Sequence, residues 1–258
     1  MAEKVPASNI EWKRWGIYDP LWGVAAWTGK NKDGANPWTE NEFYKLGESD
    51  WEDFSAQWEQ FGVNRNSVLE IGCGAGRITM PLAKYFKVVH ALDVSEGMVA
   101  FAREHVNAPS VMFHLSDGVG IPIPDNSVSA VFSCHVFQHF DSIDHATGYF
   151  REVFRVLQPG GSMMIQLPIC AWPSGIGKVI PLLYRLRRTV GDLRARLNRY
   201  LIQRFILKPI MRMTSYPVEY FYKTLGELGY TDIEISIFPT KSNGGLHHFV
   251  FAKKISEY

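Results

Sequence analysis

The sequence has few cysteines and no long apolar run, and each absence excludes a class of protein. Its 258 residues include three cysteines, Cys73, Cys134 and Cys170, an odd number without metal-ligand spacing, so neither a disulfide framework nor a structural metal site is expected. No apolar stretch approaches the about 20 residues that cross a bilayer, and the charged N-terminal residues do not resemble a signal peptide. We therefore expect a cytoplasmic protein without a metal.

Neither sign of charge dominates the chain as a whole, but its basic residues are unevenly distributed. The sequence has 27 lysines and arginines against 26 aspartates and glutamates. Ten of the basic residues lie between positions 178 and 212, where Asp192 is the only acidic residue. Apolar residues recur there every three or four positions, which predicts one or two amphipathic helices with an arginine-rich face.

Three roles are open for this basic face. It is a solvated surface, a site that attracts an acidic or phosphorylated acceptor, or a peripheral contact with an anionic membrane. Nucleic-acid binding is disfavoured, because aromatic residues are not interleaved with the basic ones in a recognisable module.

The most informative stretch runs from Val68 to Thr79 and reads VLEIGCGAGRIT. An apolar, β-branched run leads into three glycines at alternating positions, a pattern that predicts a buried strand, a tight turn and a helix start. Glycines allow positive φ and close approach of a ligand, and a helix N-terminus offers unpaired N–H groups to it. A dinucleotide fingerprint would place its third glycine where Arg77 stands. Glu70, two positions before the first glycine, suits an ammonium group better than a pyrophosphate.

This stretch resembles motif I of the class I S-adenosylmethionine-dependent methyltransferases. The resemblance implies an α/β fold with a doubly wound, mostly parallel sheet of seven strands. It also implies S-adenosylmethionine as the cofactor and S-adenosylhomocysteine as its product. Glu70 would then hold the cofactor's amino group and the backbone amides of Gly72–Gly76 its amino-acid part. The predicted cofactor site around this turn comprises Glu70, Gly72, Cys73, Gly74, Gly76 and Arg77.

The next two predicted strands supply the rest of the nucleoside site. The strand 88–92 ends at Asp93, whose two carboxylate oxygens can share the hydroxyls of a ribose. Val94 follows as a further cofactor-binding residue, and Met98 would lie against the adenine, although it is equally suited to be a core residue. After the strand 110–114, the loop Ser116-Asp117-Gly118 matches the family position at which an acidic residue accepts from the adenine amino group. A simple turn aspartate is the alternative for Asp117.

Residues after the strand 128–134 are the predicted site of chemistry, since ligands of open parallel sheets bind where strand order reverses. Ser133, Cys134 and Gln138 would flank the methionine part of the cofactor. His135 or His139 could act as a general base near neutral pH. Alternatively, His135 only contacts the cofactor and His139 forms hydrogen bonds at the rim of the sheet. The Asn- or Asp-Pro-Pro-aromatic tetrapeptide typical of nucleobase amine methylation is absent.

The first 60 residues contain seven of the eight tryptophans. Two capping boxes, Thr39 to Glu42 and Ser49 to Glu52, predict two helix starts before the glycine stretch. The aromatic residues would dock an N-terminal cap onto the domain. In a sharper interpretation, Trp15, Tyr18 or Trp22 also covers the cofactor or stacks on an acceptor.

We expect one domain over residues 1–258. It divides into an aromatic cap (1–62), a cofactor-binding core (63–169), a basic helical insertion (170–215) and a C-terminal part (216–258) in which a strand at 246–253 pairs antiparallel beside the strand at 162–167. The expected function is methyl transfer to an oxygen or nitrogen of a small organic acceptor, of anionic or amphiphilic character. The alternatives are methylation of an RNA or protein, and binding of S-adenosylmethionine without turnover.

Overall fold

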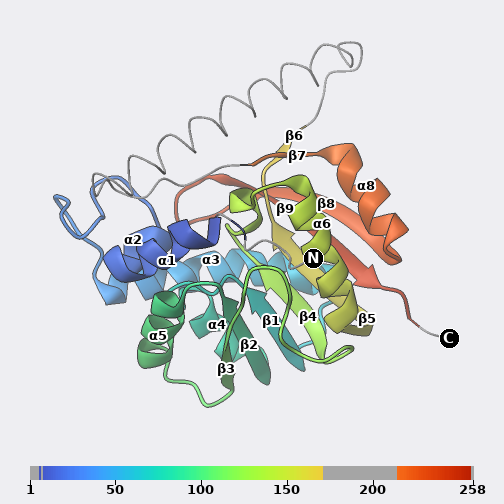
Figure 1. Cartoon of the computed structure of the whole chain (residues 1–258), viewed down its shortest axis with the longest axis horizontal. Helices are drawn as coiled ribbons and strands as arrows, with labels where there is room; N and C mark the ends of the chain where they lie inside the picture. Colours follow the sequence, from blue (N-terminus) through green and yellow to red (C-terminus); the bar gives the residue numbers. More distant parts are fainter. Residues whose placement is uncertain (1–5, 7, 171–213, 257–258) are drawn as a thin grey trace, which may run out of the picture.

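A twisted seven-stranded sheet forms the centre of the computed structural model, which describes residues 6, 8–170 and 214–256 (Figure 1). The strand order is β3-β2-β1-β4-β5-β9-β8, and all neighbours are parallel except β9, which is antiparallel to β5 and to β8. This confirms the predicted doubly wound sheet with its antiparallel last strand. The strands are β1 (Ser67–Ile71), β2 (Val88–Asp93), β3 (Val111–Leu115), β4 (Val128–Ser133), β5 (Leu157–Gln166), β8 (Tyr230–Pro239) and β9 (Leu246–Lys254), with a separate short pair β6 (Ile169–Cys170) and β7 (Tyr216–Pro217).

Helices cover both faces of the sheet. α6 and α8 pack on one face, and α3 and α4 pack on the other (Figure 1). The two short helices α1 and α2 lie beside α5 at one end. The helices are α1 (Ser8–Tyr18), α2 (Pro20–Val24), α3 (Glu40–Phe61), α4 (Thr79–Tyr85), α5 (Glu96–His105), α6 (Ile143–Val156) and α8 (Val218–Glu227), with a 3-10 turn η1 (Phe137–His139).

The prediction of two helix starts before β1 was half right. Thr39 and Glu42 form a reciprocal capping box at the start of α3. Ser49 and Glu52 do not start a helix, because they lie inside the 22-residue α3. The apolar face of α3 continues without interruption past Ser49, and burial of that face favours one continuous helix over a break.

Tryptophans of α3 form part of the main core, as the docking interpretation predicts. Trp51 is 6% exposed and Trp58 is fully buried. The Trp58 indole N–H donates to the Ser162 hydroxyl on β5 at 3.0 Å, so its polar atom is satisfied inside the core. The helix is therefore a full layer of the domain rather than a peripheral cap.

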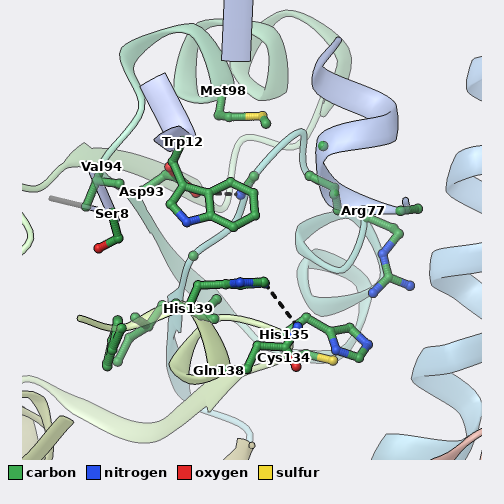
Figure 2. A pocket seen from close by; sticks show the side chains of 18 of the residues that line it. Ser8, Trp12, Arg77, Asp93, Val94, Met98, Cys134, His135, Gln138 and His139 are labelled. Carbon is green, nitrogen blue, oxygen red and sulfur yellow. Dashed lines mark hydrogen bonds between the residues drawn. The ribbon is translucent and has the colours of Figure 1, made fainter. Parts of the chain in front are cut away.

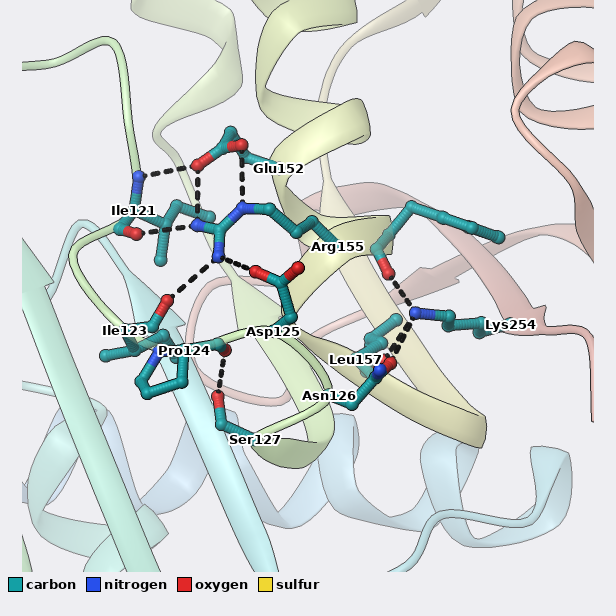
Figure 3. A network of polar contacts seen from close by, with 11 residues as sticks. Ile121, Ile123, Pro124, Asp125, Asn126, Ser127, Glu152, Arg155, Leu157 and Lys254 are labelled. Carbon is teal, nitrogen blue, oxygen red and sulfur yellow. Dashed lines mark hydrogen bonds and ion pairs between the residues drawn. The ribbon is translucent and has the colours of Figure 1, made fainter.

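The Arg155-Val156-Leu157 sequence before Pro159-Gly160-Gly161 has a structural role. The Arg155 guanidinium bonds the carbonyl oxygens of Ile121 and Ile123 and the carboxylates of Glu152 and Asp125 (Figure 3). These bonds fix the loop between β3 and β4 against the end of α6. The loop therefore enters β4 in one defined register.

The predicted basic helices fall at 178–212 and lie outside the described residues. None of the helices in the described part of the chain is long and apolar enough to cross a membrane.

Two histidines face each other across β2 and β3. The Nδ1 atom of His90 lies 3.0 Å from the Nε2 atom of His114, and the rings are stacked. Burial lowers the pKa of both side chains, and the neighbouring His114 lowers the pKa of His90 further. Because an unfolded histidine takes up a proton at a higher pH than these do, the pair lowers folding stability as the pH falls below about 6.5.

We predict that His114→Phe makes the stability less sensitive to acid. Urea unfolding of the wild type and the variant at about pH 8 and about pH 5.5 measures this, and the wild type should lose more stability between the two. Glu70, whose pKa burial raises to about 7, acts with the opposite sign in an overlapping range, so only the difference between the two proteins isolates the pair. Equal losses in both proteins would contradict the prediction.

Candidate functional site

A cavity of about 320 Å³ lies over the carboxyl ends of the parallel strands (Figure 2). This volume falls in the usual range of small-ligand sites. Its described walls come from α1, α2, α3, the turn after β1, the ends of β2 and β4, the loop after β3, and the turn between β8 and β9. The cavity therefore lies at the topological switch point between β1 and β4, as predicted for a doubly wound sheet.

The glycine turn after β1 forms the floor of the cavity. Gly72 and Gly74 line it, and Gly72, Gly74 and Gly76 have φ values of 77°, 52° and 84°. A Cβ atom on Gly72 would come within 2.1 Å of the Val136 side chain. Glycine at this position therefore serves both the left-handed backbone and the close packing of the turn.

The prediction that this turn offers unpaired amides to a ligand is wrong for four of its five residues. The N–H groups of Gly72 and Cys73 donate to the carbonyl oxygen of Leu92, and the N–H of Gly74 donates to the Asp93 carboxylate at 2.9 Å. The N–H of Gly76 donates to the carbonyl oxygen of Cys73. The turn thus gives a ligand bare backbone to lie against rather than free donors.

Asp93 ends β2 at the cavity, as predicted. One carboxylate oxygen accepts from the N–H of Gly74, and the other accepts from the N–H of Ser95 at 2.8 Å. Burial raises the pKa of Asp93, while these backbone bonds oppose the rise. Each oxygen keeps a second lone pair, so the carboxylate can still accept from two hydroxyl groups.

Glu70 does not lie where the resemblance places it. Its side chain is 3% exposed, is not among the residues that line the cavity, and accepts from the Thr79 hydroxyl at 2.6 Å. Burial raises the pKa of Glu70 to about 7. The structure therefore gives Glu70 a role in joining β1 to the start of α4, and a direct contact with a ligand's amino group is not supported.

Asp117 follows the alternative interpretation, a turn aspartate. Its side chain is exposed and accepts from the N–H groups of Val119 and Gly120 at 2.9 and 3.1 Å, and these bonds lower its pKa. Its carbonyl oxygen accepts from the Asn9 amide. The neighbouring Ser116 and Gly118 do line the cavity, so the loop contributes to the site without the Asp117 carboxylate.

The other predicted cofactor residues divide into two groups. Three are buried below the cavity, where the Ser133 hydroxyl donates to the carbonyl oxygen of Ile71 at 2.9 Å and ties β4 to β1; these are Cys73, Gly76 and Ser133. Five line the cavity, namely Arg77, Val94, Met98, Cys134 and Gln138. Met98 also belongs to the apolar cluster under α1 and α2, which confirms its role as a core residue, and its contact with an adenine stays a prediction.

His135 faces the cavity in a strained conformation. Its φ is 60°, and its N–H donates to the Gln166 side chain at 2.9 Å. Burial, with contributions from Arg77 and two neighbouring histidines, lowers the pKa of His135 to about 3. The imidazole is therefore neutral at pH 7 and poorly suited to retain a proton taken from an acceptor.

His139 lies at the opposite edge of the same wall. Its ring packs edge-on against Trp12 at 4.8 Å, and its Nε2 atom lies 3.0 Å from the Gln138 amide nitrogen (Figure 2). Because an amide nitrogen only donates, Nε2 is the accepting nitrogen and the ring is held in a defined orientation. This bond occupies the lone pair that would take up a proton, so a base role for His139 requires an acceptor to displace the Gln138 amide and stays a prediction.

A buried ion pair closes the end of the cavity near Cys134. Arg77 bonds the Asp50 carboxylate on α3, and the side chains of the two residues are 6% and 9% exposed. The second oxygen of Asp50 accepts from the Ser242 hydroxyl. Within the described structure, the Nε atom of Arg77 is buried without a hydrogen-bond partner.

Residues 69–165 match the family model described as a methyltransferase domain. The match covers somewhat over a third of the chain. Residues 69–165 therefore form a methyltransferase domain, and the sheet has the class I architecture.

The similar proteins match only part of this chain, and the match spans only part of each of them. A malonyl-[acyl-carrier protein] O-methyltransferase from Methylococcus capsulatus is 34% identical over 99 residues, 37% of this chain and 35% of that protein. Phosphoethanolamine N-methyltransferase 3 from Arabidopsis thaliana is 34% identical over 101 residues, 38% of this chain and 20% of that protein. The matches thus span about a third and a fifth of these relatives.

A solved structure shows the same fold over most of the chain. Magnesium protoporphyrin IX methyltransferase from Synechocystis PCC 6803, solved with bound S-adenosylhomocysteine, has a TM-score of 0.59 and 16% identity over 95% of this chain and 97% of that one. At this identity the likeness supports the class I architecture alone.

The methyltransferase domain also has cavity residues that the sequence analysis missed. Ser8, Asn9 and Trp12 come from α1, Asp50 from α3, and the remainder include Trp27, His145, Tyr149, Asn243 and His247. Trp12 and Trp27, and not Trp15, Tyr18 or Trp22, line the cavity. A signal existed for Asp50, because a carboxylate on the apolar face of an amphipathic helix needs a buried partner.

The contact between α3 and the glycine turn can be tested at Gly47. A Cβ atom there would lie 2.0 Å from the carbonyl oxygen of Arg77, whereas Gly148 in α6 has nothing within 4 Å. We predict that Gly47→Ala destabilises the domain by about 1–3 kcal/mol through overpacking. Gly148→Ala is the matched control and should stabilise by about 0.5–1 kcal/mol through helix propensity. Denaturant unfolding measures both, and a stabilised Gly47→Ala variant would show that α3 does not rest on the turn.

Proposed function

We propose that the protein is an S-adenosylmethionine-dependent methyltransferase that methylates an oxygen or nitrogen atom of a small organic acceptor. The observation that carries the proposal is one cavity in which a left-handed glycine turn, Gly72–Gly76, meets the Asp93 carboxylate, within a chain that matches the methyltransferase family model. The cofactor, when bound, supplies an electrophilic methyl group on a sulfonium. The residues of this chain bind, orient and exclude water.

The nucleoside end of the cavity fits such a cofactor. Asp93 offers two carboxylate oxygens to ribose hydroxyls, and Val94 and Met98 offer apolar surface to a base. Ser116 and Gly118 border the same region, and Asn9 covers the loop from above through its bond to the Asp117 carbonyl oxygen at 2.7 Å. In this arrangement the adenine of the cofactor would lie on the side of α1 and α5, and its amino-acid part would lie on the side of Arg77.

The acceptor side is formed by aromatic and neutral polar groups. Trp12, Trp27, His139 and Gln138 line it. A cavity of about 320 Å³, part of which the cofactor would fill, favours a small molecule or a slender chain end over a folded macromolecule. The names of the relatives include one O-methyltransferase and one N-methyltransferase, so both acceptor atoms belong to the proposal.

His139 is the proposed base where the acceptor enters protonated. Its ring orientation is set by Gln138 and Trp12. His135 stays neutral because of its lowered pKa and would donate or accept hydrogen bonds without changing charge. Both therefore remain in the proposed site, with different roles.

The activity is tested by incubating the full chain with methyl-labelled S-adenosylmethionine and a panel of carboxylic acids, phenols and amines. Transfer of label to one small acceptor, with stoichiometric release of S-adenosylhomocysteine, supports the proposal. Binding of the cofactor without turnover on any acceptor, or transfer only to protein or RNA, would replace it with one of the alternatives.

We predict that Asp93→Ala is more damaging to cofactor binding than His139→Ala. Loss of charge-assisted bonds to the ribose should weaken S-adenosylhomocysteine binding by about 10- to 100-fold. His139→Ala should leave that affinity within about twofold and reduce kcat only for acceptors that enter protonated. Calorimetric titration and steady-state kinetics separate the two effects, with the exposed Glu104→Ala on α5 as the control. Unchanged affinity in Asp93→Ala would remove Asp93 from the site.

A further inference from the structure

The buried pair Arg77–Asp50 has the chemistry of a receptor for a zwitterion. Arg77 is the only lysine or arginine among the described residues that line the cavity. Asp50 is beside it, and the only other carboxylate among those lining residues, Asp93, lies at the nucleoside end, where it accepts from the N–H groups of Gly74 and Ser95. The end of the cavity near Cys134 therefore presents one cationic and one anionic group in contact.

Both members of the pair keep capacity for a ligand. Among the described residues, the Nε atom of Arg77 has no partner although the residue is 5% exposed, and a buried unpaired donor is costly unless a bound group uses it. Asp50 accepts from Arg77 and Ser242 on different oxygens. Each oxygen keeps a further lone pair for an ammonium group.

The surroundings of the pair limit what it can bind. Burial lowers the pKa of His135 and of His247, which line the same end, so both are neutral at pH 7. A simple anion would meet Arg77 but also the negative charge of Asp50. A group that carries a carboxylate and an ammonium on one carbon satisfies both charges and leaves the end neutral.

We propose that Arg77 and Asp50 together bind the amino-acid end of the cofactor, with its carboxylate on the Arg77 guanidinium and its ammonium on Asp50. This inference rests on the proposed function. It assigns the binding of the cofactor's ammonium group to Asp50 instead of Glu70, which the sequence predicted. Helix α3 would then take part in ligand binding. Gly47 makes this possible, because the absence of a Cβ atom lets α3 pack closely on the backbone of Arg77.

Two ligands that differ only in this end provide the test. S-adenosylhomocysteine and 5′-methylthioadenosine share the nucleoside and a neutral thioether, and only the first carries the amino acid. The ratio of their dissociation constants, measured by calorimetry, isolates the binding of that end. In the wild type we expect S-adenosylhomocysteine to bind more tightly by about 10- to 100-fold, the size expected for hydrogen bonds to charged groups.

Asp50→Asn should reduce this ratio by about tenfold or more while 5′-methylthioadenosine binds as in the wild type. The double variant Arg77→Met with Asp50→Asn removes both charges and leaves no buried charge unpaired, and its ratio should fall close to one. Unchanged binding of 5′-methylthioadenosine shows that each variant keeps its fold. Arg65→Gln, at an exposed ion pair with Glu59, is the matched control, and Glu70→Gln should also keep the wild-type ratio.

The outcomes are distinguishable. A wild-type ratio in both the single and the double variant overturns the inference, and so does a reduced ratio in Glu70→Gln alone. If the double variant keeps the wild-type ratio but binds a carboxylate acceptor more weakly, Arg77 binds the acceptor instead, and the inference is also overturned. If the wild type binds neither nucleoside, the proposed function itself fails.

Discussion

Three consecutive N–H groups of the glycine turn bond to the end of β2, and the site depends on this attachment. Gly72 and Cys73 share the Leu92 carbonyl oxygen, and Gly74 uses the Asp93 carboxylate. The bonds fix the turn against β2, the strand that ends at Asp93, the proposed ribose-binding residue. The distance between the turn and Asp93 therefore does not depend on a bound molecule. The cost of ordering this region is met during folding, which is how a preorganised site lowers the cost of binding.

The same attachment explains why the turn needs its glycines. Donors that point inward to β2 cannot point outward to a ligand, so recognition passes to side chains around the turn, such as Asp93 and Arg77. The turn itself contributes a left-handed path and the absence of Cβ atoms, because Val136 and Val24 pack directly onto Gly72 and Gly74. The glycines are therefore required by close packing within the protein as much as by a ligand.

Much of the architecture could be predicted from the sequence, because strong local signals agreed with the global fold. The alternating strands and the position of Asp93 follow from periodicity and from the register of a parallel sheet, and the antiparallel insertion of β9 follows from the resemblance to class I methyltransferases. These features depend on backbone order, which sequence patterns describe well.

Side-chain partners were less predictable, because they depend on contacts between distant segments. Asp117 and Glu70 carry the right chemistry at the right strand ends, yet Asp117 bonds its own loop and Glu70 bonds Thr79. In each case a partner at most nine residues away along the chain already bonds the carboxylate. Asp50 shows the converse, since its partner Arg77 is 27 residues away and no local pattern joins them.

The N-terminal helices combine two functions that are often separate. The aromatic face of α3 forms the core under β4 and β5 through Trp51, Phe54 and Trp58, while one polar position on that face, Asp50, reaches the cavity. A helix held by such a large apolar contact cannot move without exposing it to water. The charge that Asp50 presents is therefore fixed in place at the cavity, beside Arg77.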